Sequence, residues 1–399
     1  MDSNFLISRQ PIFGSNINVV AYEVRFCPIE ITADAALPAS AERALFEMFT
    51  GSSLDQIVGT SDCFISLTPN GIAEGLWKLT PKSRVVLGLP GEFGPSDTAA
   101  QDALTLLDQG YRLTISDRLC SESLDLLGNR AHAIQVDAIG YDPSALEKRV
   151  QELRRYPAKL LAANVDTYDD LEYCRTLEFD FYQGRFVSRS ASQTKEVPVN
   201  RLALMRVLAQ LQQPDMPMPD LERIISQDVS LSFKLLRYAN SAAVALPRKV
   251  ASVGHAVRLL GMDLLRNWAR VLLMSAVEDK PRELMTIALV RARMCERLSE
   301  SLPTAQKESF FSAGLLSVLD ALLDCPMEKA VAELPLVDEV REALTTRAGP
   351  IGQALRCTIA YERADWDDVQ FYGLPPLPIR DIYMEAISWA QQLTTGLLS

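Results

Sequence analysis

Residues that could carry out chemistry are few in this chain of 399 residues, which contains only two histidines, His132 and His255. A Ser-His-Asp triad would have to use one of these two, and no Gly-x-Ser-x-Gly elbow is present. The glycine-rich stretch at residues 88–91 lacks the Lys and Ser/Thr of a phosphate-binding loop. These patterns give no indication of a serine hydrolase or a P-loop nucleotide hydrolase.

The seven cysteines are scattered, without a Cys-x-x-Cys pair. Their spacing indicates neither a thiolate metal site nor a disulfide framework, so we expect reduced, mostly buried thiols. They are Cys27, Cys63, Cys120, Cys174, Cys295, Cys325 and Cys357.

The first half of the chain alternates β-rich runs with helical patterns, which implies parallel strand pairing with right-handed crossovers. The runs that we predict as strands are 5–7, 18–26, 64–67, 84–89, 112–115, 133–136, 159–165 and 180–183. This number of repeats predicts a (β/α)8-like barrel. In such barrels the functional side chains stand at the C-terminal ends of the strands.

The second half shows helical periodicity only, so we predict an all-helical domain. Residues 187–200 are polar and contain a proline, which is typical of a linker. We therefore predict a barrel at residues 1–190, a linker at 191–200 and a helical domain at 201–399. Ser252 is expected to cap a helix over residues 253–260.

The helical half resembles the HDOD domain, a module related to HD-type phosphohydrolases that usually lacks their metal ligands. The resemblance is carried by LLRYANSA at 235–242, PRKVASV at 247–253 and AVRLLG at 256–261. Where active relatives have the sequence GLLHD, residues 314–318 are GLLSV, so the resemblance implies no metal site. We expect His255 to be a half-buried structural histidine.

The barrel half resembles the EAL domain, which in its active form hydrolyses the bacterial messenger cyclic di-GMP. RQPIF at 9–13 and AYEVRF at 21–26 are similar to the start of that family, and residues 165–186 to its end. Together with the second half, the chain is similar to the EAL–HDOD two-domain signalling proteins of bacteria. An active EAL site uses carboxylate and amide ligands for two divalent cations.

Most positions where the resemblance places such ligands hold other residues here. Glu23 is kept, but the expected phosphate-binding arginine is Cys27. The positions expected to hold polar or charged groups are instead Ser66, Gly88, Ser116, Gln135 and Ala163. Because each lost group lowers turnover strongly, we predict that the chain is not an enzyme and has no catalytic residue, metal or cofactor.

The acids that remain could line a former ligand pocket at the barrel mouth. This candidate pocket consists of Glu23, Asp117, Asp137, Asp166 and Gln183. The alternative is a structural role, in which each carboxylate caps a helix or pairs with Arg9, Arg25 or Arg118.

Composition limits the partners. The formal net charge of −11 and the absence of a basic arm do not favour nucleic acid. No apolar run approaches the roughly 18 residues needed to span a membrane, and the first residues do not resemble a signal peptide, so we expect a cytoplasmic protein. A homo-oligomer is compatible with the sequence.

Three functions follow from these patterns. The first is noncatalytic bacterial signal transduction through contacts with an unidentified signalling protein. The second is a sensor that binds cyclic di-GMP or another nucleotide, and the third is a weak cyclic di-GMP phosphodiesterase.

Overall fold

The computed structural model divides into two compact units, which we describe separately. The structure describes residues 5–29, 52–68, 71–72, 74–89, 97–189, 217–220, 222, 235, 239, 252–261, 265, 280–303, 305–332, 334 and 336–398. The predicted linker at 191–200 and most of the segment 231–251 lie outside these residues.

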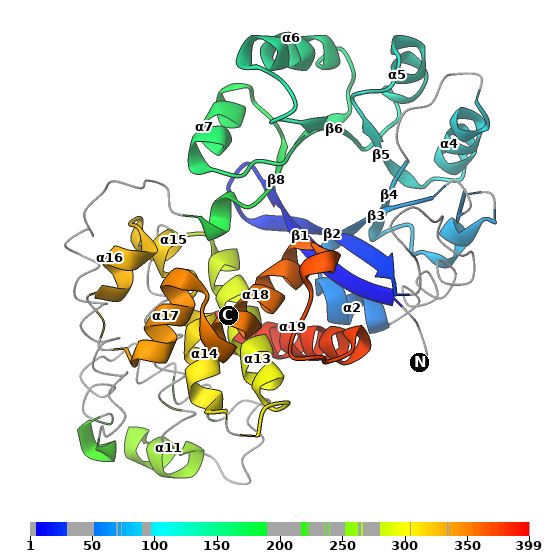
Figure 1. Cartoon of the computed structure of the whole chain (residues 1–399). Coiled ribbons are helices and arrows are strands. Elements are labelled where there is room, and N and C mark those ends of the chain that lie inside the picture. The colour runs from blue at the N-terminus through cyan, green and yellow to red at the C-terminus, as the bar shows by residue number, and fades with distance from the viewer. Residues whose placement is uncertain are drawn as a thin grey trace. The chain divides into compact units, whose positions relative to one another are not determined.

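The first unit contains a closed eight-stranded barrel in the order β1 to β8, with α4–α7 on its outside (Figure 1). Its strands are β1 (Phe5–Gly14), β2 (Val19–Pro28), β3 (Asp62–Ser66), β4 (Val85–Gly88), β5 (Arg112–Ser116), β6 (Ala133–Asp137), β7 (Lys159–Ala163) and β8 (Phe181–Gln183). Its helices are α2 (Ser52–Val58), α4 (Thr98–Asp108), α5 (Ser121–Leu127), α6 (Pro143–Leu153) and α7 (Tyr168–Thr176). The predicted barrel is confirmed.

The expectation of parallel pairing throughout is wrong for β1. Strands β2 to β8 are parallel, but β1 pairs antiparallel with both β2 and β8. The reason is a tight turn after Gly14, in which Ile17 has a positive φ of 56° and donates to the Gly14 carbonyl at 2.9 Å. This turn folds β1 and β2 into a hairpin, and the hairpin extends β1 well beyond the predicted residues 5–7.

Local signals in the sequence fix the helices around the barrel. The Asp142 side chain accepts from the backbone N of Ala145 at 3.0 Å at the start of α6. Thr167 and Asp170 form a reciprocal capping box at the start of α7. Such caps satisfy backbone donors that the first helical turn leaves without partners.

The first unit also takes in two short segments from the end of the chain, Ala360–Val369 and Pro375–Arg380. Tyr361 is fully buried, and its hydroxyl accepts from the backbone N of Ile7 in β1 at 3.3 Å. The compact units therefore differ from the predicted domains by these two segments, although the domain boundaries themselves stay a prediction.

The second unit is helical in every part that the structure describes. Its elements are α11 (Val253–Leu260), α13 (Arg282–Ser299), α14 (Lys307–Leu316), α15 (Leu319–Leu323), α16 (Met327–Ala332), α17 (Asp338–Thr346), most of α18 (Gly349–Arg363) and most of α19 (Pro376–Leu398). Helix α11 has the predicted bounds, and its expected cap is present, since His255 N donates to Ser252 Oγ at 3.2 Å. Within the described ranges, none of the helices combines the length and apolar character that a membrane span requires.

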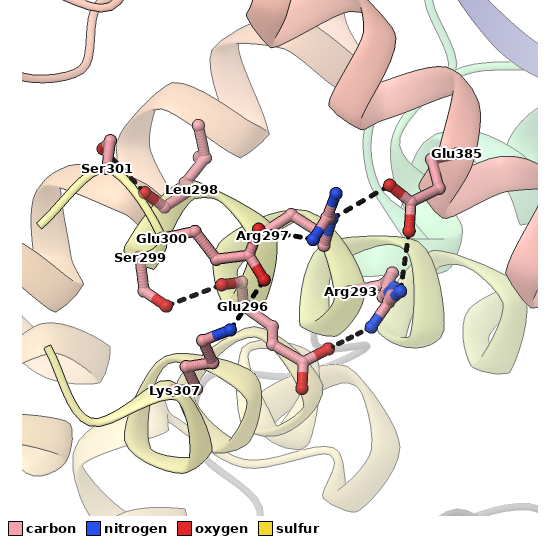
Figure 2. Close-up of polar contacts among 9 residues, drawn as sticks. All are labelled: Arg293, Glu296, Arg297, Leu298, Ser299, Glu300, Ser301, Lys307 and Glu385. Atoms are coloured by element: carbon pink, nitrogen blue, oxygen red, sulfur yellow. Dashed lines mark hydrogen bonds and ion pairs between the residues drawn. The ribbon is translucent and has the colours of Figure 1, made fainter.

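An ion-pair network joins α13 to α19 in the second unit (Figure 2). The Glu385 carboxylate accepts from Arg293 NH2 at 2.6 Å and from Arg297 Nε at 2.9 Å. All three side chains are partly exposed, with Glu385 at 39%. Water and salt screen such pairs, so each adds little to stability.

We expect Glu385→Gln to lower the free energy of unfolding by about 0.5–1 kcal/mol at low salt. Urea unfolding at 0.05 M and 1 M NaCl would measure this, and the difference from the unchanged chain should shrink at high salt. The matched control is Glu342→Gln, an exposed residue on α17. An equal loss in both variants would contradict a role for the network.

Candidate functional site

The inward-facing side chains of the barrel form layers, because alternate residues of each strand face its interior. One layer is the apolar core of Ile12, Ala21, Phe64, Val86 and Leu161, with Phe181 packed against it. The strand registers place the next inward residues toward the C-terminal ends of β2–β8. We call these residues, together with Gln10 of the antiparallel β1, the rim layer: Gln10, Glu23, Ser66, Gly88, Thr114, Ser116, Gln135, Asp137, Ala163 and Gln183.

Glu23 and Gln183, two residues of the candidate pocket, are in contact in the rim layer. Gln183 Nε2 donates to Glu23 Oε2 at 2.7 Å and also lies 3.0 Å from Gln10 Oε1. Arg25 Nε donates to the same Glu23 oxygen at 2.8 Å. Gln183 is 2% exposed, whereas the side chain of Arg25 is 41% exposed. The buried Gln183 amide therefore orients the Glu23 carboxylate, and the Arg25 side chain remains partly exposed to solvent.

Small and neutral side chains occupy much of the remaining rim layer. A Cβ added at Gly88 would lie 3.1 Å from Ser66 Oγ and 3.5 Å from Thr114 Cγ2. The Thr114 hydroxyl is buried and has no hydrogen-bond partner among the residues that the structure describes. Since a buried hydroxyl without a partner costs free energy, Thr114 Oγ1 is available to a bound water or ligand.

Asp117 does not belong to this layer, which corrects its place in the candidate pocket. Because Ser116 and its partner Gln135 face inward, Asp117 faces outward, and it is 1% exposed. Its carboxylate accepts from Tyr141 Oη at 2.5 Å and from Arg149 Nε of α6 at 3.4 Å. Burial raises the pKa of Tyr141, and the hydrogen bond to Asp117 raises it further. Through its contact with Arg149, Asp117 therefore links α6 to the end of β5.

Asp137 and Asp166 each bind a separate arginine. Asp137 accepts from Arg118 NH2 at 3.3 Å and from Asn164 Nδ2 at 3.0 Å. Asp166 accepts from Arg185 Nε at 2.9 Å. Two of the expected arginines thus pair with acids of the candidate pocket, Arg25 with Glu23 and Arg118 with Asp137. The third, Arg9, instead lies 4.2 Å from the centroid of the Tyr22 ring.

The divalent cations implied by the EAL resemblance do not fit the carboxylates as the structure holds them. Glu23 is bound by Arg25, and Asp117 is turned toward α6. In the described parts of the chain, no three side chains of the His, Cys, Asp or Glu type come together as a cation site.

Cys27 stands where the resemblance places a phosphate-binding arginine. Burial raises the pKa of the Cys27 thiol, and the nearby Asp367 carboxylate raises it further. The thiol is consequently protonated at neutral pH and offers no positive charge to an anion. In this unit Arg25, two residues earlier on the same face of β2, is the cation next to Glu23.

Sequence reasoning missed three residues around the candidate pocket: Gln10, Thr114 and Arg185. For Gln10 a signal was present, because it belongs to the RQPIF motif, but the predicted strand ended at residue 7. Burial lowers the pKa of Arg185, as do the neighbouring Arg189 and Arg363, against the effect of Asp365. No local pattern in the sequence indicates that Arg185 lies close to Arg189, Arg363 and Asp365.

A buried polar cluster lies in the helical unit next to residues 317–318, where the active relatives have His-Asp. Arg291 of α13 is 3% exposed, and its NH1 donates to Ser317 Oγ at 3.2 Å. Asp320, in the first turn of α15, has a buried Oδ1 that finds no hydrogen-bond partner within the described ranges. His255 is half-buried, as expected.

Comparisons with known proteins support the two-domain organisation. The HDOD domain family matches residues 198–355. A Vibrio cholerae protein named cyclic di-GMP phosphodiesterase CdgJ is 28% identical over 403 residues, covering 97% of this chain and 92% of its own. YuxH of Bacillus subtilis, described only as uncharacterised, is 25% identical and covers 97% of this chain and 98% of its own.

Solved structures of EAL proteins are also similar to this chain. One is a standalone EAL protein from Vibrio cholerae bound to cyclic di-GMP, which is 13% identical with a TM-score of 0.37. The match covers 48% of this chain and 93% of that protein.

The Vibrio cholerae relative contradicts the expectation that the chain is not an enzyme, because that relative matches nearly the whole chain and is named a phosphodiesterase. Our expectation came from counting substitutions against the ligand pattern of one family. Such a count registers which residues are lost from a pattern, and it does not register other residues that could do the same work.

Proposed function

We propose that this two-domain protein, with an EAL-type barrel followed by an HDOD domain, acts in cyclic di-GMP signalling and binds that nucleotide at the rim layer of its barrel. The observation that carries the proposal is the hydrogen-bonded group of Glu23, Gln183 and Arg25. The name of the full-length relative supports the choice of nucleotide.

The chemistry of the rim layer suits a cyclic dinucleotide. A carboxylate accepts hydrogen bonds from the N1–H and amino group of a guanine base, as Glu23 could do. An arginine binds phosphate oxygens through charge-assisted hydrogen bonds, and Arg25 is exposed enough to reach one. The Thr114 hydroxyl supplies a further donor inside the barrel.

A second candidate is hydrolysis of the same nucleotide, which the name of the relative favours. In that reaction water adds to one phosphodiester, the bond from phosphorus to the ribose 3′ oxygen breaks, and a linear dinucleotide with a 5′-phosphate is released. Glu23, held by Gln183, is the carboxylate of this chain in a position to orient water or substrate. A signalling protein as partner of the HDOD unit stays a prediction.

We expect Arg25→Gln to weaken cyclic di-GMP binding about tenfold, since it removes a charge-assisted contact. Isothermal titration with the full chain measures this. The matched control is Arg130→Gln, an exposed arginine that pairs with Asp108 and should leave the affinity unchanged. Absence of binding to the unchanged chain at millimolar nucleotide would refute the proposal.

The hydrolysis candidate has its own measurement. The full chain is incubated with cyclic di-GMP and Mg²⁺ or Mn²⁺, and the linear product is followed by chromatography. Product that forms with the unchanged chain and is lost in Glu23→Gln supports hydrolysis at the rim layer. Binding without product would leave binding alone as the function of this site.

A further inference from the structure

The opposite end of the barrel, at the N-terminal ends of the strands, gathers basic side chains from three adjacent strands. Arg112 is the first residue of β5, Lys159 is the first residue of β7, and His132 directly precedes β6. His132 N donates to the Leu113 carbonyl at 2.8 Å, and Lys159 N donates to the His132 carbonyl at 3.2 Å. The three residues therefore lie at the same ends of three neighbouring strands, with His132 bonded through its backbone to Leu113 on one side and to Lys159 on the other.

The strand registers turn Arg112 and Lys159 toward the barrel interior. Arg112 is paired with Val86, which belongs to the apolar core layer. Lys159 lies two residues before Leu161, another member of that layer, and therefore faces the same side. Both side chains thus lie beneath the core layer, on the side away from the rim layer.

The His132 ring rests on the aromatic part of the core. Its centroid lies 6.2 Å from that of Phe64 and 6.3 Å from that of Phe181. Lys159 Nζ lies 4.8 Å from the centroid of the same Phe181 ring. The imidazole and the ammonium group consequently both lie against the ring of Phe181.

The charges at this end are not balanced. Asp62 is the carboxylate that meets this group, and it already pairs with Arg112 NH1 at 2.6 Å. Arg112 Nη2 donates to the Ser83 carbonyl at 3.0 Å, whereas its Nε is buried without a partner in the described parts of the chain. Burial lowers the pKa of His132, and Arg112 and Lys159 lower it further, against the opposing effect of Asp62. Among the described residues, Asp62 is thus the carboxylate that acts on His132 beside Arg112 and Lys159. Asp180, which directly precedes β8 at the same end, pairs with Arg154 at 3.8 Å.

We propose that Arg112, His132 and Lys159 form a binding site for a small phosphate-type oxyanion at the N-terminal end of the barrel. The anion accepts the buried Arg112 Nε–H, an ammonium hydrogen of Lys159 and an imidazole N–H of His132. Its negative charge removes the excess of positive charge. This site is separate from the rim layer and does not depend on cyclic di-GMP binding.

The chain has only two histidines, so proton NMR can follow His132 directly, with His255→Gln to assign the signals. Inorganic phosphate is the probe, sulfate is a second dianion, and chloride at matched ionic strength controls for screening. We expect phosphate and sulfate to shift the His132 signal saturably. Both anions should also raise the pKa of His132 by about 1, because they should bind the protonated ring about tenfold more tightly than the neutral ring.

Two exposed lysines provide matched variants. Lys159→Gln should weaken phosphate binding about tenfold, and Lys148→Gln on α6 should leave it unchanged. Methyl phosphate that binds as well as phosphate would identify a phosphate monoester as ligand, and its failure to bind would identify the free anion. The site is refuted if chloride moves the His132 pKa as much as phosphate does, or if Lys159→Gln binds phosphate normally.

Discussion

Replacing Gly184 by alanine is expected to lower the free energy of unfolding by about 3 kcal/mol, the upper part of the range for overpacking. A Cβ at this position would lie 1.8 Å from the Val165 carbonyl oxygen and 2.4 Å from its carbonyl carbon. These are backbone atoms, which cannot swing away as a side chain does. The connection after β7 must therefore shift, or β8 must separate from it.

The measurement is urea or thermal unfolding of the full chain, with Gly88→Ala as the matched control. Gly88 also ends a barrel strand, but a Cβ there would meet Ser66 Oγ at 3.1 Å and no atom closer. A small change in this control and a large loss in Gly184→Ala would locate the cost in the contact with Val165. Equal losses in both variants would show that the barrel tolerates no added methyl group at any strand end.

The same substitution should disturb the rim layer. Gly184 follows Gln183, whose amide holds the Glu23 carboxylate at 2.7 Å. A shift of the backbone at residue 184 moves this amide, so any folded Gly184→Ala protein should bind cyclic di-GMP more weakly. Unchanged affinity in a folded variant would separate the packing role of Gly184 from the site.

The barrel could be predicted from sequence because seven of its strands form by short-range rules. Each of these strands is a short apolar run next to a helical pattern, and the runs at 112–115 and 133–136 agree with β5 and β6 to within one residue. The first strand could not be predicted in the same way. Its direction depends on the positive φ at Ile17, a conformation that β-branched residues rarely adopt and that sequence patterns do not indicate there.

The candidate pocket could be predicted only in part. Glu23 and Gln183 do meet, but their contact joins strands 160 residues apart, and only the family resemblance pointed to it. Asp117 was placed on the wrong side because a shift of one residue at a strand end reverses the direction of a side chain. Its partners, Tyr141 and Arg149, lie 24 and 32 residues further along the chain, beyond the reach of local patterns.

In the helical unit, helix propensity and periodicity could predict the helices. They could not predict which charged side chains are buried. The structure divides the helical segment between residues 307 and 323 into α14 and α15 around Ser317 and Val318. Ser317 Oγ lies 2.7 Å from the Gly314 carbonyl and 3.2 Å from Arg291 NH1. Asp320, in the first turn of α15, has one buried carboxylate oxygen close to this break.

We expect Arg291→Met to lower the free energy of unfolding by about 3 kcal/mol at pH 7, because it leaves a buried carboxylate without its nearby cation. Burial raises the pKa of Asp320, and Arg291 and Arg347 oppose that rise. Without Arg291 the pKa of Asp320 rises further. Methionine fills a similar volume, so the loss would come mainly from charge.

The pH dependence of this loss follows from the sign of the pKa shift. A carboxyl group whose pKa is raised on folding costs stability above its folded pKa, and the cost disappears below its unfolded pKa of about 3.9. The deficit of Arg291→Met relative to the unchanged chain should therefore shrink as pH falls through this window. Unfolding curves at several pH values measure it.

The double variant Arg291→Met with Asp320→Asn distinguishes charge from packing. Asparagine cannot ionise, so it should recover most of the loss at pH 7, and the deficit of the double variant should not depend on pH through Asp320. Asp320→Asn alone serves as the reference for the cycle. If the two single losses simply add in the double variant, Arg291 does not act by neutralising Asp320, and its contribution is then the packing of its side chain and its hydrogen bond to Ser317.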